Sequence, residues 1–217
     1  MKESTGLSRE VALVPDRSAL LYIDVQNYAT RREGGEFRHL DAAALAEHEY
    51  YLERLVSTAL PNMRRLRQAC RDAGLEVLYT VIENLTLDGR ERSLDYKISG
   101  IDVAKGSWDA QVHEDLAPGP DEIVLRKGSS SVFVSTNVDY LLRNLGIRQL
   151  VVCGVVTDQC VESAVRDACD LGYLVTLVPD ACATGTPERQ AASVRAIAGY
   201  CRQRTTDEIV AELGGTG

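Results

Sequence analysis

Three side chains with complementary chemistry stand near the ends of three apolar runs of the chain. Asp24 lies in the run SALLYIDV, Lys127 ends the run DEIVLRK, and Cys160 follows the run QLVVCGVV by four residues. A thiol becomes a nucleophile when it loses its proton, a carboxylate can take that proton, and an ammonium group balances the negative charge that develops. The three residues therefore predict nucleophilic catalysis by Cys160, with Asp24 as general acid and base and Lys127 beside them.

The turn before Cys160 strengthens this prediction. We expect Cys160 in the first turn of a helix, where backbone amides without partners favour a thiolate. The amides of the Val156–Cys160 turn are also suited to holding an oxyanion, so the N–H groups of Val156 and Cys160 are the predicted oxyanion hole. Each residue has a plainer alternative when taken alone: Cys160 as a small buried turn residue, Asp24 as a turn acid, and Lys127 as a solvated strand end.

Other chemistries have less support in the sequence. The chain has no CxxC pair, and its histidines (His39, His48 and His113) lack the spacing of zinc ligands, so we expect neither a metal nor a cofactor. We expect the histidines to be solvated, with His39 the one that could contact a substrate. Lys127-Gly128-Ser129 lacks the first glycine of a phosphate loop, no GxGxxG follows the first apolar run, and Ser129–Ser131 has no GxSxG elbow.

The elements that must position these residues alternate along the chain. Runs of strand character are followed by stretches with helical spacing, and a longer segment, Asn84–Pro120, has neither pattern and is expected to be an irregular, functional excursion. The expected strands are Ser18–Val25, Leu75–Glu83, Asp121–Lys127, Gln149–Val156, Tyr173–Val178 and Arg202–Thr205, and the expected helical regions are Ala42–Ala73, Asn137–Leu145, Gln159–Leu171, Glu188–Tyr200 and a turn from Thr206 or Asp207.

Such alternation predicts one α/β domain over residues 1–217, with its core at about 18–213. Its doubly wound parallel sheet of about six strands would carry helices on both faces, as a three-layer sandwich. Ligands of such sheets bind beyond the carboxyl ends of the strands, near the switch in strand order, which is where the three chemical residues are expected.

Composition narrows the classes of partner. The 217 residues carry 24 Lys and Arg against 32 Asp and Glu, a net charge of −8, which argues against nucleic acids and anionic membranes. No apolar run approaches the roughly 18 residues of a membrane helix, and the first ten residues do not resemble a signal peptide. We therefore expect a cytoplasmic protein whose six cysteines stay reduced.

The segments around the three residues resemble one known family. ALLYIDVQN surrounds Asp24, LRKGSSSVF surrounds Lys127, and GVVTDQCVESAVRDACDLGY surrounds Cys160, with LVPDACAT after it. Together they resemble the isochorismatase-like cysteine hydrolases over nearly the whole chain. The resemblance implies an Asp24–Lys127–Cys160 triad, a cis peptide at Val155–Val156 that aims the Val156 N–H at the oxyanion, and a homodimer or homotetramer in which a neighbouring subunit can complete the pocket.

Within that family, the resemblance favours amide chemistry. The segment TVIENLTLDGRERSLDYK lacks the histidine metal ligands of the nicotinamidase pattern, and the branch that cleaves a vinyl ether typically lacks the cysteine that is present here. The expected substrate is a small carbamoyl or ureido compound of the biuret, triuret, ureidoacrylate or N-carbamoyl amino acid type. The expected substrate-binding residues are Gln26, Asn27, Tyr28, Phe37, Glu83, Asn84, Arg90, Tyr96, Lys97, Thr157 and Gln159.

Three alternatives stay open at this point. One is another activity of the family, that of a nicotinamidase or an isochorismatase. The second is a catalytically degenerate binding protein of the same fold. The third is redox sensing through Cys160, which needs a resolving thiol, and the nearest cysteine in sequence, Cys153, lies inside an expected strand.

Overall fold

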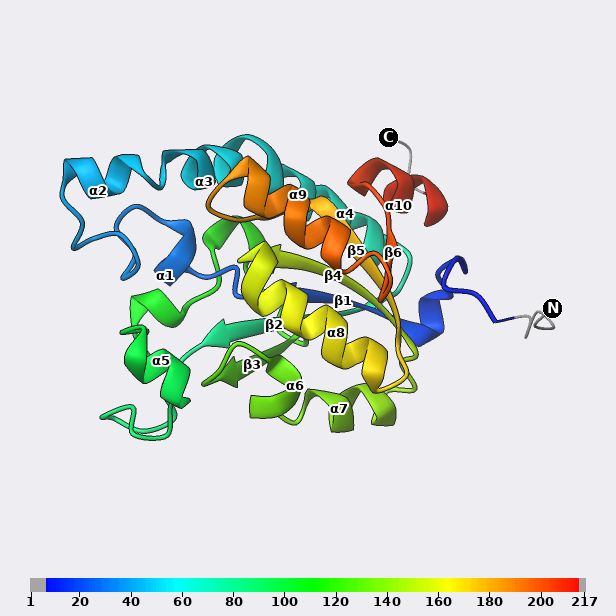
Figure 1. The fold of residues 1–217 in the computed structure, drawn as a ribbon. Helices are drawn as coiled ribbons and strands as arrows, with labels where there is room; N and C mark the ends of the chain where they lie inside the picture. Colours follow the sequence, from blue (N-terminus) through cyan, green and yellow to red (C-terminus); the bar gives the residue numbers. More distant parts are fainter. Residues whose placement is uncertain (1–6, 215–217) are drawn as a thin grey trace, which may run out of the picture.

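The computed structural model describes residues 7–214, which contain a sheet of six parallel strands with helices packed around it (Figure 1). The strands are β1 (Ser18–Ile23), β2 (Glu76–Ile82), β3 (Ile123–Lys127), β4 (Gln149–Val155), β5 (Leu174–Ala183) and β6 (Arg202–Gln203). Their order across the sheet is β3-β2-β1-β4-β5-β6, and every pairing is parallel. The predicted fold class, a single α/β domain with a six-stranded parallel sheet, is confirmed.

The helices connect the strands and cover the sheet. The longer ones are α3 (Glu49–Arg54), α4 (Leu60–Asp72), α7 (Val138–Asn144), α8 (Glu162–Asp170), α9 (Pro187–Ala196) and α10 (Thr206–Glu212). The shorter ones are α1 (Asn27–Thr30), α2 (Ala42–Ala46), α5 (Leu94–Ile98), α6 (Val132–Ser135), the π-helical segments η2 (Leu55–Ala59) and η5 (Thr157–Val161), and the 3-10 turns η1 (Pro15–Arg17), η3 (Trp108–Ala110) and η4 (Glu114–Leu116). Among the described residues, no helix is long and apolar enough to cross a membrane.

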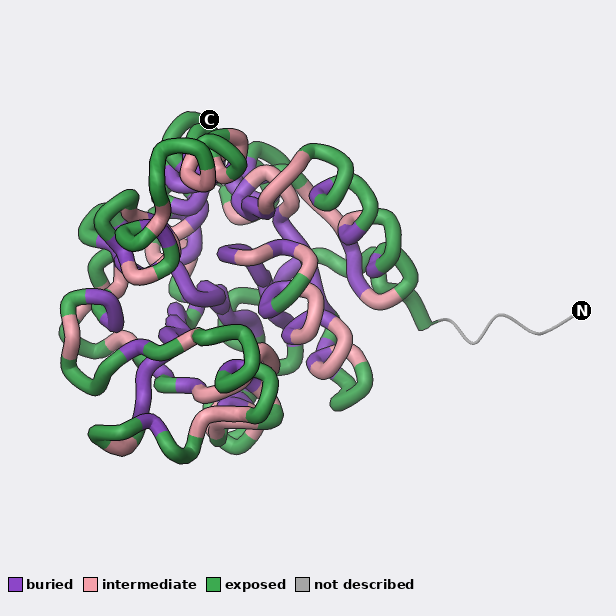
Figure 2. The backbone as a smooth tube through the Cα atoms, turned by 60° about the vertical axis from the view of Figure 1, so that its left-hand side comes forward, coloured by how far each residue is buried: buried purple, intermediate pink, exposed green. Residues whose placement is uncertain are grey.

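The core lies in the central strands, because these are covered on both faces. Every residue of β1 and of β4 is buried, as the near-continuous apolar runs of these strands predict. On one face, Tyr22 of β1 stacks on Tyr79 of β2 and donates a hydrogen bond from its hydroxyl to the Met63 carbonyl in α4. Figure 2 shows the resulting division between a buried interior and an exposed outer surface.

The helical regions differ from expectation in their details. The stretch 42–73 contains α2, then α3, η2 and α4 in succession, and Pro61 stands in the first turn of α4, where its missing N–H is tolerated. The excursion 84–120 is less irregular than predicted, because it contains α5, η3 and η4. β5 continues to Ala183, beyond the predicted end at Val178.

The strand order reverses at β1, whose neighbours are β2 and β4. From β1 the chain builds outward through β2 to β3, and later through β4 to β6 on the other side. A crevice is expected at such a switch, beyond the carboxyl ends of β1 and β4. Asp24 follows β1 directly, and Cys160 lies in η5 after β4, so both face this switch point.

Candidate active site

The three residues predicted to carry chemistry meet beyond the ends of β1, β3 and β4. Lys127 Nζ lies 2.8 Å from Asp24 Oδ2 and 3.4 Å from Cys160 Sγ. All three residues are buried, with 1% of Lys127, 1% of Asp24 and 6% of Cys160 exposed. The structure therefore brings an acid, an ammonium group and a thiol into direct contact in a setting of low polarity.

Asp24 is held by the neighbouring strand. The Thr80 hydroxyl in β2 donates a 2.7 Å hydrogen bond to Asp24 Oδ1, and the Asp24 amide donates to the Thr80 carbonyl at 3.1 Å. Asp24 takes a φ of 52°, a left-handed conformation that Asp tolerates better than most residues. Lys127 ends β3, on the far side of β2, so its long side chain must pass the end of β2 to reach Asp24.

The approach to Cys160 depends on a close contact between β1 and β4. Gly154 has a φ of 131°, and a Cβ there would lie 2.2 Å from the Ile23 carbonyl oxygen, so only glycine fits. The next peptide bond, Val155–Val156, is cis, as the family resemblance implied. Cys160 then stands in the π-helical turn η5, and this segment was predicted as the first turn of an α-helix.

The electrostatics of the cluster keep a proton on the sulfur. Burial, followed by the negative charge of Asp24, raises the pKa of Cys160 to about 11, against the opposing effects of Lys127 and Tyr96. Burial alone would lower the pKa of Lys127, but the charges of Asp24 and Cys160 together raise it above its ordinary value. At neutral pH the cluster therefore holds a thiol and an ammonium group.

Cys160 and Asp24 open onto a cavity of about 670 Å³. Four of the predicted substrate-binding residues line it, namely Tyr28, Phe37, Tyr96 and Gln159. Val156, which with Cys160 is predicted to form the oxyanion hole, lines it too. The aromatic side chains form apolar walls, and Gln159 adds a polar, exposed group.

Other predicted substrate-binding residues lie away from this cavity, bonded to the protein itself. Gln26 donates to the carbonyls of Ile82 and Asp109 and accepts from the Ile82 amide. The remaining ones make these contacts: Asn27 donates to the Trp108 carbonyl, Asn84 to Asp102, Arg90 to Asp88, Lys97 to the Arg90 carbonyl, and Thr157 to Gln190. The polar side chains of these residues therefore stabilise the loops around the site through hydrogen bonds within the protein.

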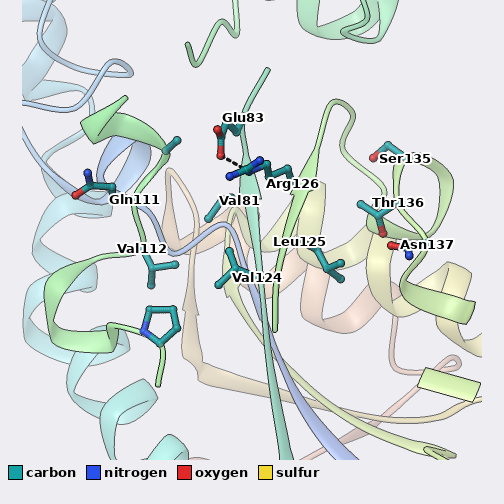
Figure 3. A pocket seen from close by; sticks show the side chains of 12 residues that line it. Val81, Glu83, Gln111, Val112, Val124, Leu125, Arg126, Ser135, Thr136 and Asn137 are labelled. Carbon is teal, nitrogen blue, oxygen red and sulfur yellow. Dashed lines mark ion pairs between the residues drawn. The ribbon is translucent and has the colours of Figure 1, made fainter. Parts of the chain in front are cut away.

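Glu83 lies in a separate cavity, of about 640 Å³, between the 110–118 segment and β3. Figure 3 shows its carboxylate paired with Arg126, at 2.8 Å between Oε2 and Nε. Its other oxygen accepts a hydrogen bond from the Gly106 amide. Neither Cys160 nor Asp24 lines this second cavity.

The sequence analysis did not name several residues that line the first cavity. They are Ala29, Glu36, Glu47, Tyr51, Ile82, Asp95, Ser99, Ile101, Gly185, Thr186 and Arg189. His48, Ser130 and Val155 also line it, and the sequence analysis names them without predicting that they bind substrate. Gly185, Thr186 and Arg189 follow β5 at the same edge of the sheet, so the strand-end rule that identified Asp24 could have found them. The residues of the 36–51 region come from helices and loops that fold over the site, and no local pattern marks them.

Of the three histidines predicted to be solvated, His39 is exposed, whereas His48 is half-buried and His113 is buried. His48 lines the cavity and packs edge-on against Phe37, with ring centroids 5.3 Å apart. His113 is buried, accepts a hydrogen bond from the Asp115 amide, and has its pKa lowered mainly by burial. His39 is exposed and does not line the cavity, so the expected substrate contact is not visible there. Within residues 7–214, no group of three or more His, Cys, Asp or Glu side chains is arranged to hold a metal ion.

Known proteins share both the sequence pattern and the fold. The model of the isochorismatase domain matches residues 18–208. A cysteine hydrolase from Pseudomonas syringae pv. phaseolicola 1448A superposes with a TM-score of 0.81 at 24% identity, covering 94% of this chain and 96% of that one. An isochorismatase family protein from Desulfovibrio vulgaris gives 0.72 at 25% identity, with 90% and 98% covered.

An N-carbamoylsarcosine amidase from Thermoplasma acidophilum is also similar, with a TM-score of 0.68 at 25% identity and with 89% of this chain and 98% of that chain covered. The matched domain spans all six strands and includes Asp24, Lys127 and Cys160. The chain belongs to the isochorismatase family of hydrolases.

Proposed function

We propose that this protein is a cysteine-dependent amidohydrolase that cleaves the C–N bond of a small carbamoyl or ureido compound. The observation that carries the proposal is the contact of a thiol, a carboxylate and an ammonium group at a cavity that Asp24 and Cys160 line. Lys127 Nζ is within 3.4 Å of Cys160 Sγ and 2.8 Å of Asp24 Oδ2. These are the groups that acyl transfer through a thioester requires.

The reaction begins with a proton transfer from Cys160 to Asp24. The sulfur lone pair then forms a bond to the substrate carbonyl carbon, and the π electrons of the carbonyl move onto its oxygen. The N–H groups of Val156 and Cys160 stabilise that oxyanion. When the oxyanion collapses, the C–N bond breaks, Asp24 protonates the departing nitrogen, and a thioester remains on Cys160.

A water molecule completes the cycle. Asp24, again a carboxylate, takes a proton from water, whose oxygen attacks the thioester carbonyl. The C–S bond breaks, the thiol of Cys160 is restored, and an acid or a carbamate leaves. Lys127 stays protonated throughout, because its raised pKa keeps it an ammonium group that offsets the charge of Asp24.

The lining of the cavity supports a small substrate rich in N–H groups. Glu36, Glu47 and Asp95 supply carboxylate oxygens that can accept N–H hydrogen bonds, and Gln159 supplies an amide. Tyr28, Phe37 and Tyr51 add flat apolar walls. Similarity to an N-carbamoylsarcosine amidase supports the same class of substrate, since N-carbamoylsarcosine is itself a ureide.

An ammonia-release screen tests the proposal. Biuret, triuret, ureidoacrylate, N-carbamoyl amino acids and nicotinamide are offered to the wild-type protein, to Cys160→Ala and to Cys169→Ala. Cys169 is half-buried in α8 and does not line the cavity, so its variant is the matched control. We expect release from a ureide by wild type and Cys169→Ala, and none by Cys160→Ala.

Mass spectrometry of the quenched wild-type reaction should show the acyl adduct on Cys160. Full turnover by Cys160→Ala would disprove the mechanism. Nicotinamide as the only compound hydrolysed would disprove the assigned substrate class while leaving the thiol chemistry intact.

A further inference from the structure

Tyr96 places a hydroxyl inside the catalytic cluster. The residue is 1% exposed, and its oxygen lies 2.9 Å from Lys127 Nζ and 3.8 Å from Cys160 Sγ. Its ring also lies beneath the ammonium group, with Nζ 5.5 Å from the ring centroid. The hydroxyl thus touches both the charge-balancing group and the reacting atom.

The chemistry of the two partners decides the direction of these hydrogen bonds. An ammonium group has donors but no acceptor, so Lys127 donates and the Tyr96 oxygen accepts. The single hydroxyl proton of Tyr96 is then left for another acceptor, and Cys160 Sγ is its other recorded partner among the described residues. Burial raises the pKa of Tyr96 far above its ordinary value, so the proton stays on the oxygen.

Lys127 alone cannot give the Cys160 sulfur a hydrogen bond of its own. Its three N–H groups face the Asp24 carboxylate, the Tyr96 hydroxyl, the Ser129 carbonyl at 2.8 Å and the Ser130 carbonyl at 3.3 Å, in addition to the sulfur. Five acceptors compete for three donors, so the ammonium proton is shared. Among the described residues, the Tyr96 hydroxyl has no hydrogen-bond acceptor other than the sulfur, so it can donate its proton there.

The backbone around Tyr96 fixes the hydroxyl in this place. The Ser93 side chain caps α5 by accepting from the Tyr96 amide at 3.2 Å, and the Ser93 amide donates to the Gly128 carbonyl at 2.9 Å. Gly128 directly follows Lys127, so α5 is tied to the same strand end as the lysine. The Tyr96 carbonyl in turn accepts from the Ile101 amide at 2.9 Å.

We propose that Tyr96 is a further catalytic residue whose hydroxyl donates a hydrogen bond to Cys160 Sγ and stabilises the thiolate. This role rests on the proposed thiol chemistry and adds a fourth group to it. The thiol proton passes to Asp24, the electron pair stays on sulfur until it attacks the carbonyl carbon, and Tyr96 keeps its own proton throughout. When the thioester is cleaved, the same hydrogen bond stabilises the departing sulfur.

Tyr96→Phe tests the proposal, because it removes the hydroxyl and keeps the ring. The readout is the rate at which iodoacetamide alkylates Cys160, measured by peptide mass spectrometry between about pH 7 and pH 9, since the thiolate is the reacting form. Loss of a hydrogen bond to a charged group predicts alkylation roughly 10- to 100-fold slower at each pH. Tyr173→Phe is the matched control, because Tyr173 is also a buried tyrosine, but its hydroxyl donates to Asp139 and it does not line the cavity.

Equal alkylation rates of Cys160 in wild type and Tyr96→Phe would overturn the proposal. A second outcome would also overturn it: in Tyr96→Phe, the buried Cys70 and Cys153 become labelled as fast as Cys160 is in the wild type. The substitution would then have loosened the fold, and Tyr96 would act only in packing. Replacement of Tyr96 by 3-fluorotyrosine, a stronger hydrogen-bond donor that retains the shape, should speed alkylation, and an unchanged or lower rate would count against the hydrogen bond.

Alkylation needs no amide substrate. A protein that hydrolyses nothing in the ammonia screen but shows the slow Tyr96→Phe reaction would refute the proposed function and keep the role of Tyr96. Where a substrate is found, Tyr96→Phe should lower kcat more than it raises KM, because the hydrogen bond stabilises the charge on sulfur during the chemical step.

Discussion

The Lys127–Asp24 ion pair joins the chemistry of the site to its stability. Both side chains are almost fully buried, so each charge depends on the other for the stabilisation that water would give. Asp24 Oδ2 lies 2.8 Å from the ammonium nitrogen, and the other carboxylate oxygen, Oδ1, accepts from the Thr80 hydroxyl. In the proposed mechanism this carboxylate also takes the thiol proton, so the pair serves both stability and chemistry.

Lys127→Met removes one partner of this pair and leaves the carboxylate buried without a counter-charge. We expect the free energy of unfolding to fall by about 3–5 kcal/mol at pH 7 and hydrolysis to drop below detection. Urea unfolding followed by circular dichroism measures the first effect. Lys97→Met is the control, because Lys97 is exposed and donates to the Arg90 carbonyl. An equal loss in both variants would contradict a special role for the buried pair.

At the scale of the elements, Gln26 connects the end of β1 to β2 and to the 84–120 segment that follows β2. Its side chain is fully buried and bonds both the amide and the carbonyl of Ile82 and the carbonyl of Asp109. A glutamine two residues after an aspartate that is predicted to be catalytic suggests substrate binding. The sequence pattern does not show that the backbone groups of Ile82 and Asp109 will reach this side chain. Tertiary structure gives it a role in holding the loops together.

Gln26→Leu should therefore destabilise the fold, whereas Gln159→Leu should not. The first variant leaves buried backbone groups unpaired, at about 1–3 kcal/mol for each group, and the second changes an exposed side chain at the cavity. Thermal unfolding measures both. Gln159→Leu should instead change KM for a substrate, and a stable Gln26→Leu protein would show that these hydrogen bonds contribute little.

Over the whole molecule, burial controls the pKa values of most cysteine thiols. Burial raises the pKa of Cys70 and Cys182 to about 12 and that of Cys201 to about 11, as it does for Cys160. In the folded protein these thiols keep their protons at pH values where the unfolded chain, with an ordinary thiol pKa near 9, releases them. The unfolded state then binds fewer protons, so the free energy of unfolding falls as pH rises above about 9.

Each such thiol should lower stability by about 1.4 kcal/mol per pH unit between its unfolded and folded pKa values. We expect the urea midpoint to fall between about pH 9 and pH 11 and to stay flat between about pH 7 and pH 8. Cys182→Ala should lose less than wild type over the same interval, because one titrating thiol is absent. A midpoint that rises with pH would contradict this burial of protonated thiols.

The sequence by itself determined the alternation of strands and helices and the placement of Asp24, Lys127 and Cys160 near one edge. The physical reason is local: a strand buried on both faces needs a continuous apolar run, and polar residues that stop the run stand at its end. Strand ends of a parallel sheet share one edge, so such residues can be collected without knowing the contacts.

Tertiary structure alone decided what surrounds that cluster. Tyr96 reaches it because the excursion folds back and the Ser93 amide binds the Gly128 carbonyl, a contact between segments with no shared pattern. Glu36, from the turns after α1, and His48, at the start of α3, line the cavity together with residues that follow β4 and β5. Residues on loops are placed by packing against parts of the chain far away in sequence, whereas residues at strand ends are placed by the strand itself.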